Sequence, residues 1–366
     1  MRIVYFTHSL RSCWNHGNAH FLRGVLRELQ ERGHDVVALE PAGNWSLTNL
    51  LADAGEAGLD AFRAAYPTLS PVTYAPGTDP AELVDGADLV IMHEWNEPAL
   101  VAAVGRLRQR GAPFQLLFHD THHRAVSAPA EMKAFDLSGY DGVLAFGETL
   151  SDVYRGWGWS GRVWTWHEAA DTRLFHPPAI ESPRDGLVWI GNWGDGERTA
   201  ELEEFLFAPA RDADLPLDIY GVRYPDAALA TLARYGIGYH GWAPNARAPA
   251  IFAAALATVH VPRRYYATIL PGIPTIRVFE ALACGIPLLS APWEDSEALF
   301  RPGDYVKVAD GAAMTAALRD LRDDPARRAG LAAAGLETIR ARHTCDHRAD
   351  ELLAIVAGLS QHRTAA

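Results

Sequence analysis

Polar residues with the chemistry of an anion site gather at the start of an apolar stretch, Pro271–Pro292. The expected helix begins directly after Thr275, and the unpaired backbone N–H groups of a first helical turn bind phosphate oxygens well. Thr275 adds a hydroxyl donor and Arg277 a positive charge. Glu280 shares a helix face with Arg277, and a carboxylate at that depth can accept two hydroxyl protons from a ribose. The pattern predicts a nucleoside phosphate site, although a helix in which Glu280 only pairs with Arg277 has the same spacing.

A second source of positive charge is the segment VPRRYY, Val261–Tyr266, which ends an apolar run. Its two guanidinium groups fall where a parallel sheet places its ligands. Arg263 is the preferred further phosphate contact, because a planar guanidinium can hold two oxygens at once. A solvated pair of arginines is the alternative interpretation.

Histidines are concentrated in two loops of the N-terminal half, each of which follows an apolar run. One loop carries His8, His16 and His20, and the other reads HDTHHR over His119–Arg124. An imidazole held by a carboxylate has a pKa near neutrality and is a suitable general base for a hydroxyl group. The candidates for such a base are His20, His16 and Asp120.

Two further groups are candidates for recognition of a second substrate. Glu94, which follows the run Leu89–Met92, and His122 could bind hydroxyl groups, although Glu94 would equally well stabilise a helix start. The HDTHH run could instead hold zinc through imidazoles and a carboxylate. Because the adjacent His122 and His123 point in different directions on a regular element, we expect no metal site.

The elements that must position these groups alternate in type along the chain, which predicts an α/β protein with two doubly wound parallel sheets. The expected strands of the N-terminal half are Arg2–Thr7, Asp35–Leu39, Leu89–Met92, Phe114–Phe118, Gly142–Ala145 and Arg162–Trp166. Those of the C-terminal half are Leu187–Ile190, Leu217–Tyr220, Ala257–Val261, Pro287–Leu289 and Tyr305–Val308. Ligands of such sheets sit outside the carboxyl ends of the strands, so an interdomain cleft is the expected site.

Helical periodicity and a proline-rich stretch complete the domain plan. The expected helices are Asn18–Arg32, Pro98–Gln109, Glu148–Tyr154, Glu201–Phe207, Ala248–Ala255, Ile276–Ala283, Ala312–Arg322, Pro325–Ala341 and His347–Leu359. Prolines at 177, 178 and 183 mark a linker over residues 171–184. It separates an N-terminal domain, 1–170, from a C-terminal domain, 185–345. A final helix, 346–366, could pack back on the N-terminal domain.

Composition limits the partners that the protein can have. The chain has 366 residues, of which 49% are hydrophobic and 21% charged, so two globular domains are expected. The formal net charge of −12 provides no basic field for a phosphate backbone. A nucleic acid polymer is therefore not an expected partner.

The cellular location is predicted to be cytoplasmic. Cys13, Cys284 and Cys345 lie far apart, which argues against a disulfide framework or a CxxC metal site and favours a reducing compartment. The N-terminus becomes polar after six residues, too soon for a signal peptide. No stretch reaches the roughly 18 apolar residues of a membrane-spanning helix.

The sequence RVFEALACGIPLLSAPWEDSEALFRPGDYV, Arg277–Val306, resembles the C-terminal signature of the group 1 glycosyltransferases, most closely the spore-protein CgeB-like branch. The tail, Asp324–Leu353, resembles the closing helices of the family. Gly17–Val36 is similar to its first glycine-containing loop and helix, and His167–Pro177 to its interdomain segment. The resemblance implies the GT-B fold, in which two Rossmann-like domains face an interdomain cleft, and sugar transfer from a nucleoside diphosphate.

The same resemblance implies donor contacts. The backbone amides of Gly191 and Asn192 and the guanidinium of Arg198 would approach the pyrophosphate. Trp242 would lie beside the nucleobase, or would simply cover the domain surface, and His119 would face the transferred sugar. The full set of predicted donor contacts is Gly191, Asn192, Arg198, Trp242, Arg263, Thr275, Ile276, Arg277 and Glu280.

One position departs from the family pattern. Retaining members of the family often carry E-x7-E, whose second glutamate matches Glu280, but the first position here is Gly272. The stereochemical outcome therefore stays open. An inverting enzyme needs a general base, whereas in a retaining enzyme the donor phosphate oxygens would assist the acceptor and His119 would only position the sugar.

The sequence thus predicts a hexosyltransferase-like glycosyltransferase that needs neither a metal nor a cofactor, since no DxD element is present in the expected place. Its donor would be a nucleoside-diphosphate sugar, and its acceptor an unidentified small molecule, glycan or protein. One alternative is a non-hydrolysing sugar-nucleotide epimerase, which the missing acid at Gly272 disfavours. The other is a non-catalytic coat or surface protein that has retained the fold.

Overall fold

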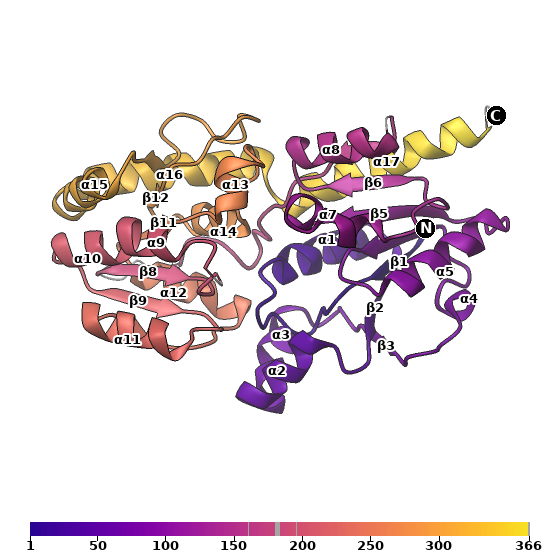
Figure 1. The fold of residues 1–366 in the computed structure, drawn as a ribbon, viewed down its shortest axis with the longest axis horizontal. Helices are drawn as coiled ribbons and strands as arrows, with labels where there is room; N and C mark the ends of the chain where they lie inside the picture. Colours follow the sequence, from indigo (N-terminus) through magenta and orange to yellow (C-terminus); the bar gives the residue numbers. More distant parts are fainter. Residues whose placement is uncertain (160, 180–183, 195, 365–366) are drawn as a thin grey trace. The chain divides into compact units, whose positions relative to one another are not determined.

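The structure, a computed structural model, describes residues 1–159, 161–179, 184–194 and 196–364. Its contacts divide the chain into two compact units (Figure 1). The first unit consists of Met1–Glu168 and Cys345–Ala366, and the second of Ala169–Thr344. Residues 180–183 of the predicted linker and residues 365–366 of the predicted final segment lie outside the described residues.

The first unit is built on a seven-stranded sheet of order β3-β2-β1-β4-β5-β6-β7. Its strands are β1 (Arg2–Phe6), β2 (Asp35–Pro41), β3 (Val72–Tyr74), β4 (Leu89–His93), β5 (Gln115–Asp120), β6 (Gly142–Ala145) and β7 (Val163–Thr165). All the pairings are parallel. The strands β4 and β5 are buried along their whole length, as continuous apolar runs predict for strands covered on both faces.

The second unit has a six-stranded sheet of order β10-β9-β8-β11-β12-β13. Its strands are β8 (Leu187–Ile190), β9 (Leu217–Tyr220), β10 (Gly238–Tyr239), β11 (Ala257–His260), β12 (Leu288–Ser290) and β13 (Val306–Lys307), all paired in parallel. In each unit the chain winds outward from the first strand and then returns to its other side. The prediction of an α/β fold with two doubly wound parallel sheets is confirmed.

Helices connect the parallel strands in both units (Figure 1). In the first unit they are α1 (Ala19–Glu31), α2 (Trp45–Ala54), α3 (Asp60–Ala65), α4 (Pro80–Leu83), α5 (Pro98–Gln109), α6 (Arg124–Ser127), α7 (Pro129–Lys133), α8 (Glu148–Tyr154) and α17 (Cys345–Thr364). In the second they are α9 (Thr199–Leu202), α10 (Ala208–Asp212), α11 (Asp226–Tyr235), α12 (Ala248–Ala254), α13 (Arg264–Thr268), α14 (Ile276–Ala283), α15 (Gly311–Asp323) and α16 (Pro325–Arg342).

Some elements differ from the sequence expectation. The predicted helix Glu201–Phe207 is part of a longer helical region, in which a wider turn, Glu203–Phe207, joins α9 to α10. The strands β3 and β10 were not expected, because both are short edge strands whose side chains are largely exposed and form no apolar run. Among the described residues, no helix has the length and apolar character that crossing a lipid bilayer requires.

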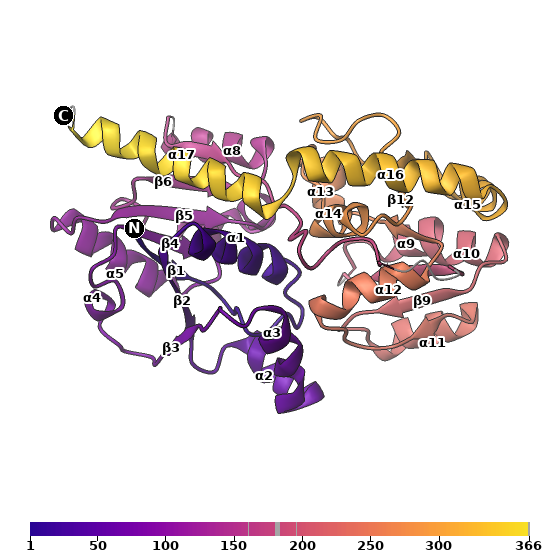
Figure 2. The ribbon, with the colours of Figure 1, turned by 180° about the vertical axis from the view of Figure 1, so that it is seen from behind.

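The last helix, α17, belongs to the first unit and lies beside α1 (Figure 2). The indole Nε1 of the buried Trp166 donates to the carbonyl oxygen of Arg348 over 2.9 Å. The side-chain amide of Gln115 donates to the carbonyl oxygen of Val356 over 3.0 Å. These bonds fix α17 to the core strand β5 and to the end of β7.

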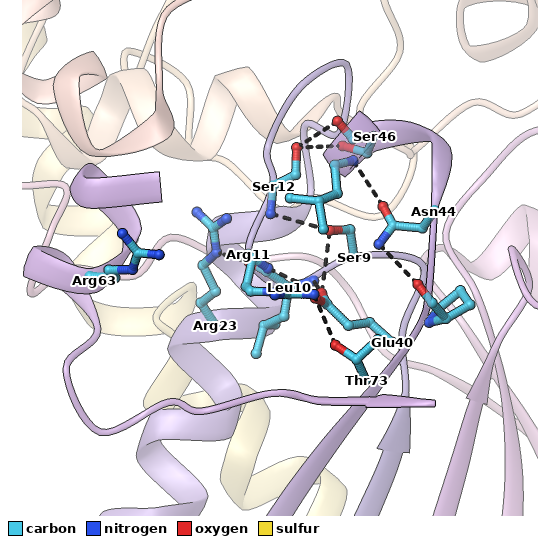
Figure 3. Close-up of polar contacts among 12 residues, drawn as sticks. Ser9, Leu10, Arg11, Ser12, Arg23, Glu40, Asn44, Ser46, Arg63 and Thr73 are labelled. Atoms are coloured by element: carbon cyan, nitrogen blue, oxygen red, sulfur yellow. Dashed lines mark hydrogen bonds and ion pairs between the residues drawn. The ribbon is translucent and has the colours of Figure 1, made fainter. Parts of the chain in front are cut away.

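The loop after β1, which carries His8 and His16, is fixed by the carboxylate of Glu40 at the end of β2 (Figure 3). Glu40 has no exposed surface, and its Oε2 accepts the backbone N–H of Leu10 at 2.7 Å. The guanidinium of Arg11 forms an ion pair with the same carboxylate. The buried carboxylate of Glu40 thus fixes the conformation of the loop that carries the two histidines.

We expect Glu40→Ala to destabilise the first unit by about 3 kcal/mol, the low end for a buried pair because Arg11 is partly exposed. The measurement is the urea midpoint of unfolding. The control is Asp35→Ala, which removes an exposed ion pair with Arg2 (2.6 Å) and should cost less than about 1 kcal/mol. Equal losses in the two variants would contradict the role given to Glu40.

Candidate functional site

In the second unit, the polar groups gather at the carboxyl edge of the sheet, between β8 and β11. The strand order reverses at this point, and such a switch leaves a crevice in which ligands of doubly wound sheets bind. Arg198 lies in the connection after β8, Arg263 lies after β11, and Arg277 lies in the first turn of α14. The fold brings together three arginines that are widely separated in sequence.

Arg198 is a buried cation, with a residue exposure of only 7%. Its Nη2 donates to the carbonyl oxygen and to Oδ1 of Asn192, at 2.9 and 2.8 Å, and its Nη1 donates to the carbonyl oxygen of Val261 at 3.3 Å. The guanidinium also lies over the ring of Trp189, 5.0 Å from its centroid. In the part of the chain that the structure describes, Arg198 has no carboxylate partner and its Nε has no hydrogen-bond acceptor.

The arginines repel one another electrostatically. Burial, with smaller contributions from the positive charges of Arg263 and then Arg277, lowers the pKa of Arg198 to about 9. The guanidinium still keeps its charge at neutral pH. Arg263 shares Asn192 Oδ1 with Arg198, at 3.2 Å, and pairs with Glu197 at 2.5 Å. An excess of positive charge is thus held at this edge, which favours an anionic ligand.

The start of α14 adds backbone donors to this edge. Thr275 precedes the helix in an extended conformation, and its side chain forms no capping hydrogen bond. The first-turn N–H groups are therefore not capped by the side chain at the position where caps usually stand. Glu280 has no exposed surface and forms an ion pair with Arg277, one turn earlier. Both the predicted anion site and the alternative Arg277–Glu280 pairing are thus compatible with the geometry.

A histidine that sequence reasoning missed, His260, ends β11. The hydroxyl of Ser290 donates to the carbonyl oxygen of Ala291 at 2.8 Å, so it accepts the Nδ1–H of His260 at 2.9 Å. Burial, followed by the charge of Arg198, lowers the pKa of His260 to about 3. The ring is neutral, and its buried Nε2 is an acceptor without a partner among the described residues.

Two predicted donor contacts, Gly191 and Asn192, already form hydrogen bonds within the protein. The amide of Gly191 donates to the carbonyl oxygen of Tyr220 at 2.8 Å, so this N–H is not available to a phosphate in the way the sequence suggested. Asn192 acts through its side-chain oxygen, which orients Arg198 and Arg263. Trp242 is half-buried, and its indole nitrogen is enclosed without an acceptor in the described part of the chain.

In the first unit, acid–base groups occupy the corresponding edge, at the ends of β4 and β5. The carboxylate of Glu94 lies 3.1 Å from His93 Nε2 and accepts the hydroxyl of Thr121 at 3.1 Å. Asp120 accepts the hydroxyl of Tyr154 at 2.7 Å and the backbone N–H of His122 at 3.0 Å. The sequence proposed Glu94, Asp120 and His122, whereas His93 and Tyr154 were missed. His93 ends the buried strand β4 and Tyr154 ends the helix α8, and an apolar pattern does not reveal an inward-facing polar group in either element.

Burial controls the charge of this cluster. It raises the pKa of Glu94, and the nearby negative charge of Asp120 raises it further. Burial also raises the pKa of Asp120 and lowers the pKa of His93 well below the ordinary value, with further lowering by His119. At neutral pH the cluster therefore retains a proton that isolated carboxylates would release.

The predicted catalytic histidines lie inside the first unit rather than on its surface. His119 is fully buried, its Nδ1 is hydrogen bonded to the Tyr5 hydroxyl at 2.6 Å, and burial lowers its pKa to about 3. Burial, followed by the charge of His8, lowers the pKa of the buried His16 well below its ordinary value. His20, in the first turn of α1, is also fully buried. These rings are packed around the strand ends.

The exposed rim of the cluster is formed around Trp95, which is 42% exposed. The guanidinium of Arg124 lies 4.0 Å from its ring centroid, and His122 and His8 lie 5.3 and 6.3 Å from it. His122 and His8 are half-buried. The sequence MHEWNEP contained the signal for Trp95, an aromatic residue directly after a buried strand end. Among the described residues, no group of histidine, cysteine and carboxylate side chains has the arrangement of a metal site.

Comparison with known proteins places these edges in context. Residues 198–354 match a family model described as glycosyl transferase-like, and this span contains Arg198, Arg263, Arg277 and Glu280. No curated protein matches the sequence. The match confirms the prediction of a glycosyltransferase, and it supports the group 1 type without identifying a branch of it.

Solved structures with little sequence identity share the fold over nearly the whole chain. An α-glucosyltransferase in complex with UDP superposes with a TM-score of 0.70 at 11% identity, covering 98% of this chain and 100% of that one. Sucrose-phosphate synthase from Thermosynechococcus elongatus gives 0.65 at 15% identity, covering 99% and 100%. T4 phage BGT in complex with its UDP-glucose substrate gives 0.61 at 12%, covering 97% and 99%. The fold is that of the GT-B glycosyltransferases.

The raised pKa of Glu94 predicts a specific dependence of stability on pH. The unfolded chain releases this proton near the ordinary carboxyl pKa, whereas the folded chain retains it up to about pH 8. Stability should therefore fall as the pH rises across this window. Glu94→Gln lacks the titration and preserves the shape, so it should gain stability relative to the native protein as the pH rises, by up to about 1.4 kcal/mol per pH unit.

The measurement is the denaturant midpoint of both proteins at pH 5, 6.5 and 8. The control is Asn96→Ala, which removes neutral hydrogen bonds to the carbonyl oxygens of Phe6 and His93 beside Glu94. Its effect should be the same at each pH. A constant difference between Glu94→Gln and the native protein would contradict the assignment.

Proposed function

We propose that this protein transfers a sugar from a nucleoside diphosphate donor to an acceptor hydroxyl, with UDP-sugars as the first candidate donors. The observation that carries the proposal is Arg198, a buried guanidinium without a carboxylate partner among the described residues. A buried charge is costly unless it is paired. A bound diphosphate would supply the missing negative charge.

The neighbouring groups fit the same ligand. Arg263 and Arg277 lie close enough to Arg198 to affect its pKa, and the start of α14 offers backbone N–H groups. The diphosphate is also the leaving group of the reaction, so these fixed positive charges would stabilise the negative charge that develops as the sugar departs. Glu280 is positioned deeper in α14 and would accept the ribose hydroxyls, in competition with its present partner Arg277.

The choice of UDP-sugars rests on two of the structural neighbours, one solved with UDP-glucose and the other with UDP. The resemblance of Arg277–Val306 to the CgeB-like branch supports a place within that part of the group 1 family. None of the three cysteines is in a disulfide, and two of them are buried, so a cytoplasmic location is part of the proposal.

The acceptor side of the proposal is the histidine and carboxylate cluster of the first unit. Asp120 and His16 are the candidates for a general base, and His119 would position the sugar as a neutral ring. His20 remains a candidate, although it is fully buried. The acceptor would be a small molecule, a glycan or a protein. One neighbour was solved with UDP and a 13-mer DNA, so DNA belongs in the acceptor panel as the competing outcome.

We expect Arg198→Met to weaken UDP binding and to leave the free protein as stable as the native one, or more stable. Loss of a charged hydrogen bond of about 1.5–3 kcal/mol corresponds to a Kd roughly 10- to 100-fold higher. Replacing an unpaired buried cation by an apolar side chain of similar shape is often neutral or stabilising. Calorimetric titration with UDP and thermal unfolding without ligand measure the two effects.

The matched control for this substitution is Arg264→Met, which removes an arginine of the same unit that is exposed and paired with Glu201 at 2.6 Å. Its UDP affinity should stay within about twofold of the native value. If the native protein binds none of UDP, GDP, dTDP and their sugars, the proposal is wrong. Conversion of a UDP-sugar to its epimer without any acceptor would support the epimerase alternative instead.

We further propose that charge neutralisation by the arginines and the α14 start makes the reaction independent of a divalent cation. Donor turnover should therefore be unchanged by excess EDTA after extensive dialysis. One structural neighbour was solved with UDP and Mn²⁺, so a metal requirement is the alternative to test. Activity that EDTA abolishes and Mn²⁺ restores would overturn this part of the proposal.

A further inference from the structure

The loop after β12, Ala291–Leu299, lies at the same carboxyl edge as the arginines, because β12 pairs in parallel with β11. Its shape is fixed from within. Asp295 accepts the backbone N–H groups of Leu299 and Phe300 at 2.9 and 2.8 Å, and Ala298 has a positive φ of 52°. A non-glycine residue in this conformation persists only where its surroundings determine it. The backbone of the loop therefore has a defined conformation, which sets the direction in which each side chain leaves it.

The loop is also tied to the segment that leads into α14. The amide of Gly272 donates to the carbonyl oxygen of Glu294 at 2.7 Å. The indole Nε1 of the buried Trp293 donates to the carbonyl oxygen of Ile273 at 3.1 Å, and the ring of Trp293 lies 5.9 Å from that of His260. The loop, the segment before α14 and the end of β11 form one packed edge.

Gly272 is the point at which this loop leaves no room for a side chain. Its φ is +88°, and a Cβ placed on it would lie 2.6 Å from Ser296 Oγ and 2.9 Å from both Cγ and Oε1 of Glu297. A glutamate at position 272 would therefore have a strained backbone, and the side chains of Ser296 and Glu297 would have to move. The carboxylate of Glu297, which is half-buried, lies in the space beside it.

The layout of the proposed donor site gives this carboxylate a position on the ligand. Along the chain, Gly272 comes first, the start of α14 comes next, and Glu280 lies within the helix. If the ribose binds at Glu280 and the diphosphate at the helix start, the sugar on the far phosphate lies beside the segment that contains Gly272. A carboxylate there accepts two sugar hydroxyl protons, and such charge-assisted bonds are strong.

We propose that Glu297 binds hydroxyl groups of the donor sugar and thereby sets which sugar is accepted. This inference rests on the proposed function, since it assigns one residue of the same site. The contact comes from the loop after β12 rather than from the segment before α14, so spacing along the sequence does not reveal it.

The experiment compares the binding of UDP with that of UDP-glucose, UDP-galactose and UDP-N-acetylglucosamine, by calorimetry, for the native protein and Glu297→Gln. The native protein should bind at least one of the sugars about tenfold or more tightly than UDP. Glu297→Gln should bind UDP within about twofold of native and lose about tenfold in affinity for that sugar, because one charged hydrogen bond is lost. Glu297→Asp, which keeps the charge on a shorter side chain, should lose less than Glu297→Gln.

Glu294→Gln is the matched control, because Glu294 is an exposed carboxylate of the same loop that contacts Gly272 through its backbone only. Both its UDP and its sugar affinities should match those of the native protein. If UDP binds but Glu297→Gln keeps the sugar preference, or if the native protein shows no preference, the inference is wrong while the donor site stands. If UDP does not bind the native protein, the proposed function itself is wrong.

Discussion

The second unit is organised around a positive charge, on Arg198, that no carboxylate among the described residues pairs with. Arg198 is surrounded by neutral acceptors, the Asn192 side chain and two carbonyl oxygens, and by the face of Trp189. Arg263 and Arg277 each have a carboxylate of their own, so their partners compensate them and leave Arg198 uncompensated. Like charges held together in a buried site repel, so the rest of the fold must hold the three arginines in place. A bound anion would reduce this repulsion. Strand order explains why the charge is at this edge. The order reverses between β8 and β11, and the loops that follow these two strands lead away in opposite directions, which leaves a crevice.

The first unit has the same topology, but burial favours the neutral forms of the groups at its sheet edge. Its strand ends carry histidines and carboxylates, and burial drives them toward their neutral forms, as the raised pKa of Glu94 and the lowered pKa of His93 indicate. Glu40, a fully buried carboxylate of this unit, is satisfied by backbone N–H groups and Arg11 rather than left open. One edge therefore suits an anion, and the other suits proton exchange and hydrogen bonding with hydroxyl groups. A reaction between a nucleotide sugar and an alcohol requires both kinds of chemistry.

The parts of this picture that the sequence predicted are those that depend on local pattern. Leu187–Ile190 and Ile276–Ala283 have the expected boundaries, because an apolar run and a helical period each determine an element without reference to its neighbours. The same holds for the pairing of Arg277 with Glu280, which helical spacing alone allows. Contacts that depend on how strands align could not be predicted. Three such contacts join residues that only the folded sheet brings together. They are the hydrogen bond from the Gly191 amide to the Tyr220 carbonyl oxygen, the bond between His260 and Ser290, and the bonds of the loop after β1 to Glu40.

Gly272 shows what such a missed contact changes. In the sequence it is only an absence, a position where the pattern that the sequence resembles often has an acid, and it leaves the expected donor-sugar contact without a residue. In the structure, the positive φ and the packing of Ser296 and Glu297 make glycine the residue that this position requires. The absence of an acid at position 272 and the close approach of the loop are therefore compatible, since a larger residue would require Ser296 and Glu297 to move. A carboxylate is still present beside the segment before α14, but it is contributed by a different part of the chain.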